Sequence, residues 1–164
     1  MTGEMGLVLG IDPGTATTGY GLVKNHQDGT LEAIHFGIIQ TPPNLSDSDR
    51  LAILHQQLKK ILRTDQPESC AVEKLFFQRN VSTAITVGQA RGVVLLSIAE
   101  AGLGVFEYTP NEVKQAVTGY GSAQKRQVQE MVRTLLGLPD IPRPDDAADA
   151  LAVAICHLNT RRYS

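Results

Sequence analysis

The feature that most constrains the fold of this chain is the apolar run near its start. Residues 7–11 read LVLGI, without the alternation of polar and apolar side chains that marks a strand with one face in water. Such a run is typical of a strand buried on both faces, as in sheets covered by helices. It ends at Asp12-Pro13-Gly14, where proline and glycine force a turn. We therefore expect a central strand with a carboxylate at its end.

The later segments predict how the sheet is completed. Further strand patterns occur at residues 18–24, 31–39, 69–73 and 105–108. Helical patterns occur at residues 51–62, 82–101, 110–118, 123–136 and 146–158. Ser48 can cap the first of these helices. Three strands followed by alternating helices and strands predict a mixed five-stranded α/β sheet flanked by helices. We expect a single domain over residues 1–164, a length that suits one core.

The helix expected at 82–101 is apolar nearly all round, so more than one of its faces should be covered. Gly88 and Gly92 lie one turn apart and would let another helix approach closely. Burial in the core and a subunit interface both explain the pattern, and both stay open.

Composition bears on the compartment. No run of apolar residues approaches the ~18–20 that a membrane span needs, and no signal peptide pattern opens the chain. Cys70 and Cys156 lie inside apolar runs, which predicts buried free thiols in a reducing cytoplasm. We therefore expect a cytoplasmic protein with no membrane partner.

Charge is only weakly informative about a nucleic-acid partner. The formal net charge is −2, whereas proteins that bind nucleic acid are often basic. However, segment 74–133 carries seven basic residues against four acidic ones. This distribution predicts a weakly basic surface.

Two carboxylates mark the ends of predicted strands. Asp12 follows the first strand and Glu73 ends the fourth. In open α/β sheets, ligands gather at the carboxyl ends of the strands. If these two strands are adjacent and parallel, both carboxylates project into one crevice.

The last predicted helix carries two more carboxylates. Residues 147–155 read AADALAVAI, which predicts a helix packed flat on the sheet. Asp146 and Asp149 are three residues apart and share a face of it. A charge on such a helix is costly unless it is paired or binds metal, and Arg143 is the only basic residue nearby. Alternatively, Asp145 and Asp146 cap the helix, which explains Asp149 less well.

The four carboxylates together indicate a metal site. Oxygen ligands without clustered histidine or cysteine favour Mg²⁺, with Mn²⁺ as a substitute. Two such ions suit in-line phosphoryl displacement, one preparing the attacking water and the other stabilising the leaving oxygen. The residues alone therefore predict a two-metal phosphoryl-transfer enzyme with an unspecified substrate.

The turn at residues 10–15, GIDPGT, also looks like the phosphate loop of actin-like ATPases and sugar kinases. Those proteins need two domains of this type with a nucleotide between them. A chain of 164 residues is too short for that arrangement, and no second glycine-rich loop is found. An actin-like ATPase fragment is therefore a minor alternative.

Several blocks of the chain, in order, resemble the RuvC family of Holliday-junction resolvases. They are LGIDPGT followed by TGYG, AVEKLFFQRN, GQARG, VKQAVTGYGSAQK, and DDAADALAVAI followed by His157. Any one block could be accidental, but together they span residues 7–158 in register.

The resemblance implies a ribonuclease-H-like fold and a magnesium-dependent endonuclease that resolves four-way (Holliday) DNA junctions. It implies a homodimer that makes symmetric nicks in two strands, leaving 5′-phosphate and 3′-hydroxyl ends. It also implies a partner, a branch-migration motor of the RuvA and RuvB type.

The resemblance also implies roles for particular residues. The family's metal-binding, catalytic positions fall on Asp12, Glu73, Asp146 and Asp149. Its DNA-binding positions fall on Phe76, Lys114 and Lys125, and Arg126 adjoins the last of these. Phe76 would stack on an unpaired base at the junction centre, since bases stack on aromatic faces. The lysines would contact the scissile phosphate and the backbone.

Three points stay open. His157 aligns with a family histidine, and we expect a structural role for it rather than proton transfer. Asp145 directly precedes Asp146 and competes with it as a ligand, although the spacing to Asp149 favours Asp146. An RNA-processing nuclease of the same fold, as in the YqgF-like proteins, is the main alternative function, and a junction-binding scaffold is a non-enzymatic one.

Overall fold

The computed structural model describes residues 6–74 and 80–162 of the chain. Five strands form one sheet in the order β3-β2-β1-β4-β5. The strands are β1 (Leu7–Asp12), β2 (Thr17–Asn25), β3 (Leu31–Gln40), β4 (Ser69–Glu73) and β5 (Val105–Tyr108). The helices are α1 (Asp47–Asp65), α2 (Val81–Glu100), α3 (Pro110–Thr118), α4 (Lys125–Leu135) and α5 (Asp145–Arg162). The predicted five-stranded fold flanked by helices is therefore confirmed.

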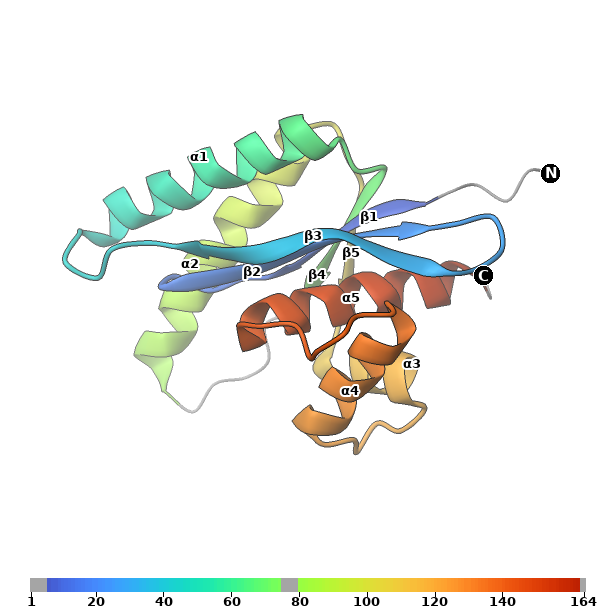
Figure 1. Ribbon diagram of the computed structural model, residues 1–164. Helices are drawn as coiled ribbons and strands as arrows, with labels where there is room; N and C mark the ends of the chain where they lie inside the picture. The colour runs from blue at the N-terminus through green and yellow to red at the C-terminus, as the bar shows by residue number, and fades with distance from the viewer. Residues whose placement is uncertain (1–5, 75–79, 163–164) are drawn as a thin grey trace.

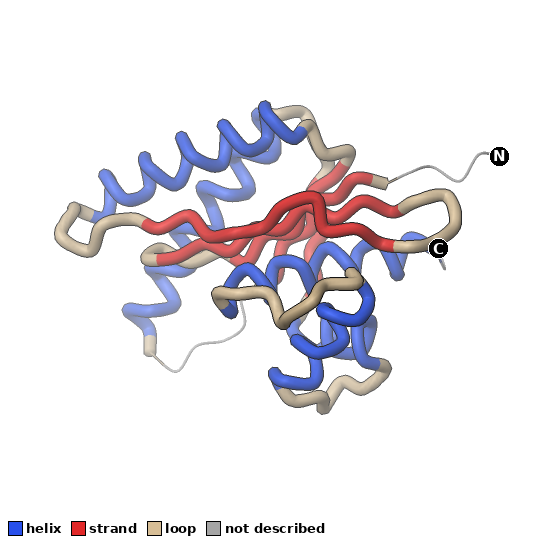
Figure 2. Tube along the Cα trace, in the orientation of Figure 1, coloured by secondary structure: helices blue, strands red, loops and turns tan. Residues whose placement is uncertain are grey.

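The sheet is mixed and has helices on both faces. β1 pairs antiparallel with β2 and parallel with β4, β2 pairs antiparallel with β3, and β4 pairs parallel with β5. α1 and α2 cover one face, and α3, α4 and α5 cover the other (Figures 1 and 2). Each face has its own hydrophobic cluster. The central strand β1 contributes Val8 to one cluster and Leu9 to the other, as expected of a strand buried on both sides.

α5 lies directly on the sheet because glycines leave room for it. A Cβ atom added to Gly10 of β1 would stand 2.0 Å from the Ala150 carbonyl oxygen. One added to Gly19 of β2 would stand 1.9 Å from the carbonyl oxygen of Asp146. Gly19 is also the strand partner of Asp12. The helix backbone can thus approach β1 and β2 where the first carboxylate lies.

α2 buries one face and exposes the other. Its buried residues are Ala90, Val94, Ser97 and Ile98. On the opposite side, Val81, Ile85 and Leu96 are 70%, 57% and 54% exposed. A Cβ atom at Gly88 or Gly92 would meet nothing within 4 Å. A single chain therefore covers only one face of this helix, so burial in the core does not by itself account for the apolar pattern.

By length and composition alone, α2 could also cross a membrane, with a mean hydropathy of 1.4 over its most apolar window. This property was not expected, because polar residues interrupt the apolar run. It is weak evidence for a membrane, since core helices of many domains have the same composition.

Two further local expectations were tested. The helix α1 is capped by Ser46, whose hydroxyl accepts from the backbone N–H of Asp49 at 3.2 Å. The predicted cap, Ser48, is wrong, because it lies within the first turn of the helix. Cys70 and Cys156 are buried free thiols, as predicted.

Candidate active site

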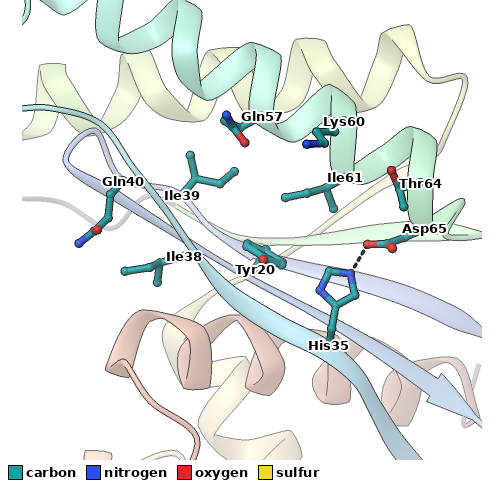
Figure 3. A pocket seen from close by; sticks show the side chains of 10 residues that line it. All are labelled: Tyr20, His35, Ile38, Ile39, Gln40, Gln57, Lys60, Ile61, Thr64 and Asp65. Atoms are coloured by element: carbon teal, nitrogen blue, oxygen red, sulfur yellow. Dashed lines mark hydrogen bonds and ion pairs between the residues drawn. The ribbon is translucent and has the colours of Figure 1, made fainter.

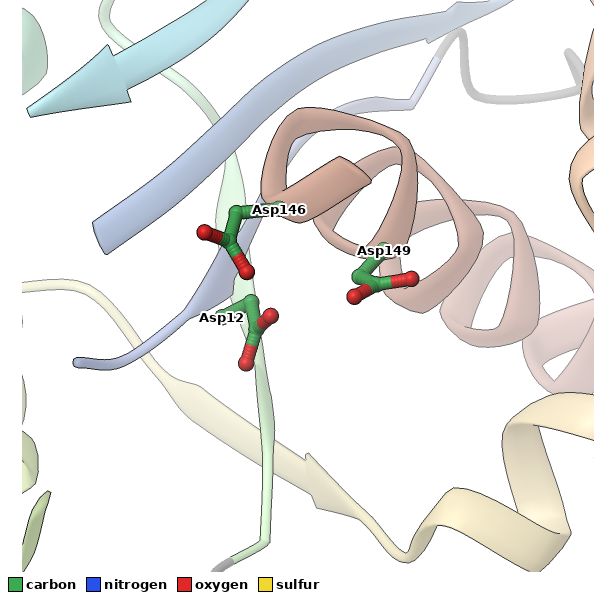
Figure 4. A group of neighbouring side chains, drawn as sticks. All are labelled: Asp12, Asp146 and Asp149. Atoms are coloured by element: carbon green, nitrogen blue, oxygen red, sulfur yellow. The ribbon is translucent and has the colours of Figure 1, made fainter. Parts of the chain in front are cut away.

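Three carboxylates converge where β1 ends and α5 begins. Ligand oxygens of Asp12, Asp146 and Asp149 all lie within 4.8 Å of one another (Figure 4). Asp12 is the last residue of β1, Asp146 lies in the first turn of α5, and Asp149 follows one turn later. The helix reaches Asp12 because Gly19 has no side chain in between.

Glu73 joins this cluster through the sheet. β1 and β4 are adjacent and parallel, with Ile11 opposite Val72, so the next residues, Asp12 and Glu73, end neighbouring strands. Their side chains hydrogen bond to each other. The expectation that both strand ends meet in one crevice is therefore met by the geometry.

The electrostatics of the cluster are unfavourable without a cation. Burial, followed by the charges of Glu73 and Asp149, raises the pKa of Asp12 to about 9. Burial also raises the pKa of Glu73 and of Asp149. Burial and the neighbouring acids therefore favour a protonated Asp12 carboxyl when no cation is present.

The residues present fit a hard divalent cation. Among the described residues the cluster consists of carboxylates alone, with no histidine or cysteine. Oxygen donors of this kind suit Mg²⁺ or Mn²⁺. A cation would remove the mutual repulsion and the cost of burying the charges. The chemistry of the acidic cluster is therefore consistent with a metal site.

The Asp145 carboxylate is not part of this cluster. Its carboxylate accepts a hydrogen bond from the Gln129 side chain at 3.2 Å and lies 3.3 Å from the Lys125 Nζ. Asp146, not Asp145, supplies the oxygen near Asp12 and Asp149.

The lysines of the predicted DNA-binding set lie close to the carboxylates. Lys125, the first residue of α4, places its Nζ 3.8 Å from Asp149. The charges of Lys114 and Lys125 both lower the pKa of Glu73, against the larger effect of burial. Arg126 is on the surface and pairs with Glu130 at 3.8 Å. Phe76 lies outside the described residues.

His157 lies in the core and contacts none of the four carboxylates. Its Nδ1 is 2.6 Å from the Tyr108 hydroxyl, and its Nε2 is 3.2 Å from the Ser69 hydroxyl. Burial lowers the pKa of His157 to about 4. These contacts fit the structural role that we expect for this residue.

One residue near the site was not anticipated. Arg91 of α2 donates from Nη1 to the Glu73 carbonyl oxygen at 3.2 Å and forms an ion pair with Glu107 of β5. The sequence did contain a signal for Arg91, because a single charged residue within an apolar helix needs a partner. Its partners, however, are 18 and 16 residues away, which helical spacing cannot identify.

A separate pocket of about 370 Å³ lies between α1 and the outer strands (Figure 3). Tyr20, His35, Lys60 and Asp65 are among its lining residues, and His35 Nε2 is 2.5 Å from a carboxylate oxygen of Asp65. None of the four clustered carboxylates lines it. The acidic site is thus distinct from this pocket.

A ribonuclease-H-like sheet with an acidic cluster at its strand ends is the arrangement expected of a nuclease. The model of one family, crossover junction endodeoxyribonuclease RuvC, matches residues 8–157. The chain belongs to the RuvC family. It is a Holliday junction resolving endonuclease of DNA recombination and repair, as the resemblance of its motifs implied.

Individual relatives agree with this assignment. The crossover junction endodeoxyribonuclease RuvC of Syntrophomonas wolfei is 56% identical over 157 residues, covering 96% of this chain and 91% of the relative. The structure of Thermus thermophilus RuvC matches with a TM-score of 0.89 and 40% identity over 96% of each chain. The same protein in complex with a Holliday junction substrate matches with a TM-score of 0.88 and 37% identity, again over 96% of each chain. The alternatives of an ATPase fragment and a YqgF-like RNA nuclease are therefore set aside.

Proposed function

We propose that this enzyme cuts two strands of a four-way DNA junction symmetrically, with Asp12, Glu73, Asp146 and Asp149 as its metal ligands and catalytic residues. The observation that carries the proposal is the convergence of three carboxylates within 4.8 Å, one of them with a pKa of about 9. Such an arrangement is costly in a folded protein unless a cation compensates it.

Two Mg²⁺ ions, for which Mn²⁺ can substitute, would activate the attacking water and stabilise the leaving oxygen, giving 5′-phosphate and 3′-hydroxyl ends. The four carboxylates would hold these ions once the Asp12 carboxyl has released its proton. Glu73 on β4 and Asp149 on α5 approach Asp12 from different elements, so the sheet and the helix together set the geometry of the site.

DNA contacts in this proposal come from the basic side of the site. Lys125 stands at the start of α4 within 4 Å of Asp149, so its ammonium group would contact a phosphate of DNA bound at the site. Lys114 adds positive charge near Glu73. The side chain of Arg126 is exposed on the protein surface, where it would reach the backbone of bound DNA. The Thermus thermophilus relative has been solved with a Holliday junction substrate, which supports this substrate class. By resemblance, Phe76 would stack on an unpaired junction base.

A homodimer is the second part of the proposal. The exposed face of α2 presents a stripe of Val81, Ile85, Gly88, Gly92 and Leu96, which recur at helical spacing. Apolar stripes of this kind mark protein interfaces, and glycines allow helices to approach closely. A twofold axis through this stripe would present two sites to two equivalent strands, which accounts for symmetric nicks. By resemblance, the dimer would act in the cytoplasm with a branch-migration motor of the RuvA and RuvB type.

The Asp149→Asn variant tests the metal site. We expect it to lower junction cleavage by more than roughly 100-fold, because even outer partners of metal ligands change activity by 10–100-fold. Binding of the labelled junction should remain close to that of the unsubstituted protein. Asp145→Asn is the matched control, since Asp145 faces Lys125 and Gln129 instead of the cluster, and it should retain most of the activity. Loss of binding together with cleavage in Asp149→Asn would point to a folding role and contradict the proposal.

A further inference from the structure

Arg91 occupies an unusual position on α2. Its side chain is only 17% exposed, and burial lowers the pKa of the guanidinium. Nη1 donates to the Glu73 carbonyl oxygen, while Nη2 pairs with the carboxylate of Glu107. One planar group therefore connects three elements, α2, β4 and β5, at the point where β4 ends.

The Glu73 carbonyl lies just beyond the point where β1 stops pairing with β4, although β5 still pairs with β4 there. The parallel register of β1 and β4 ends at Ile11 opposite Val72, one residue earlier. On the other side, the Lys74 N–H donates to the Tyr108 carbonyl oxygen at 2.8 Å. Arg91 thus donates a hydrogen bond to the peptide group that directly follows the Cα atom of Glu73. Rotation of this peptide would move the carboxylate relative to Asp12.

α2 holds the end of β1 in a comparable way. The Thr15 hydroxyl, three residues after Asp12, donates to the Thr86 carbonyl oxygen of α2 at 2.8 Å. Thr15 is itself buried. One helix therefore fixes the segments that follow both strand carboxylates, on the face of the sheet opposite α5 (Figure 1).

We propose that Arg91 is a positioning residue for Glu73, holding its peptide so that the carboxylate faces Asp12 for metal binding. This inference rests on the proposed role of Glu73 as a metal ligand. A simple structural ion pair with Glu107 would need only one guanidinium nitrogen, whereas here a second one contacts the backbone of the ligand residue itself. Lysine preserves the charge but cannot donate to both acceptors from a planar fork.

The test compares full-length Arg91→Lys with Arg133→Lys. Arg133 also pairs with a glutamate, Glu130, at 3.1 Å, but on the surface of α4. Mn²⁺ affinity is measured by calorimetry without DNA, and the cleavage rate is measured against Mg²⁺ concentration. We expect Arg91→Lys to weaken Mn²⁺ binding and raise the half-maximal Mg²⁺ concentration by roughly 10–100-fold, as for other partners of metal ligands. Saturating Mg²⁺ should restore most of the rate, and junction affinity should not change.

Three results would decide otherwise. Equal metal affinities in the two lysine variants would overturn the inference, as would a lower Tm with an unchanged Mg²⁺ midpoint. If Arg91→Lys does not fold, Glu107→Gln replaces it. That variant frees the guanidinium from its ion pair and should shift the midpoint in the same direction, so an unshifted midpoint also overturns the inference.

Glu73→Gln separates the positioning role of Arg91 from the role of Glu73 as a metal ligand. If it binds metal and cuts normally, the proposed ligand set fails, whatever Arg91 does.

Discussion

The clustered carboxylates lower the free energy of unfolding of the metal-free protein, although the proposed function requires them. The pKa of Asp12 rises to about 9, from an ordinary value of 3.8, because burial and three neighbouring acids disfavour its charge. A carboxylate whose pKa is raised in the folded state destabilises that state as the pH rises from the ordinary value to the raised one. At neutral pH the folded protein therefore holds a proton on Asp12 that the unfolded chain releases, and this difference opposes folding.

Replacing Asp12 with asparagine should reverse this effect. In EDTA at pH 7 we expect Asp12→Asn to raise the Tm by a few degrees, since about 1 kcal/mol corresponds to roughly 2–4 °C in a domain of this size. Mg²⁺ should raise the Tm of the unsubstituted protein but not of the variant. Differential scanning calorimetry measures both, with Asp140→Asn as a surface control. A lower Tm in EDTA would show that Asp12 stabilises the fold.

His157 predicts a specific acid sensitivity. Its pKa falls from 6.5 to about 4 on folding, because the ring is buried. Between these values the unfolded chain binds a proton that the folded chain does not, so stability is lost as the pH falls from about 6.5 to about 4. The loss attributable to this residue is about 3 kcal/mol. Denaturant unfolding from pH 4 to 7.5 should show a flatter profile for His157→Gln than for the unsubstituted protein. Parallel profiles would remove His157 as the cause.

Sequence reasoning located single residues where burial and charge conflict. Asp146 and Asp149 stand out because a helix as apolar as α5 has no place for free carboxylates. The same reasoning could not identify their neighbour Lys125, which comes from α4 and reaches Asp149 only through the tertiary fold. It also predicted Ser48 as the cap of α1, whereas the backbone geometry shows that Ser46 has this role.

At the scale of elements, the site depends on how closely α5 approaches the sheet. Gly19 separates Asp12 from Asp146, as the strand partner of the first and in contact with the backbone of the second. Any side chain at this position would push the start of α5 outwards. Such a displacement would change the positions of the carboxylates on α5 and would also lower the stability of the fold.

Gly19→Ala tests this contact. The added methyl group would overlap the Asp146 carbonyl, so we expect a loss of about 1–3 kcal/mol of stability and a drop in cleavage of roughly 100-fold or more. Gly104→Ala is the control, because its methyl group would lie at least 3.4 Å from its neighbours. Unfolding curves and single-turnover cleavage rates provide the measurements. Wild-type cleavage by Gly19→Ala would show that α5 tolerates displacement.

The order and pairing of the elements could largely be predicted, whereas the faces of α2 could not. The unbroken apolar run predicts β1 as a central strand. The carboxylates at the ends of β1 and β4 would meet only if these strands were adjacent and parallel, and the structure shows that they are. α2 is apolar on every side, so its periodicity has no preferred direction. Only the packing against α1 and the sheet shows that Ala90 and Val94 face inwards while Ile85 faces out.

At the scale of the whole molecule, that outward face should decide the oligomeric state. Ile85→Glu places a charge in the centre of the α2 stripe, where burial without a partner is costly. We expect the protein to change from dimer to monomer by light scattering, and junction cleavage to change from paired to single nicks. Ile34→Glu is the matched control, because this isoleucine is exposed on β3. An unchanged dimer in Ile85→Glu would place the interface elsewhere.

The most direct test of the whole account is cleavage of a labelled synthetic four-way junction in Mg²⁺. A linear DNA duplex and an RNA duplex of the same sequence are incubated beside it. The account predicts paired, symmetric nicks in the junction alone, with 5′-phosphate and 3′-hydroxyl ends, and none when EDTA removes the metal. Cutting of the RNA duplex with an intact junction would leave the fold and the acidic site standing but contradict the function assigned to them.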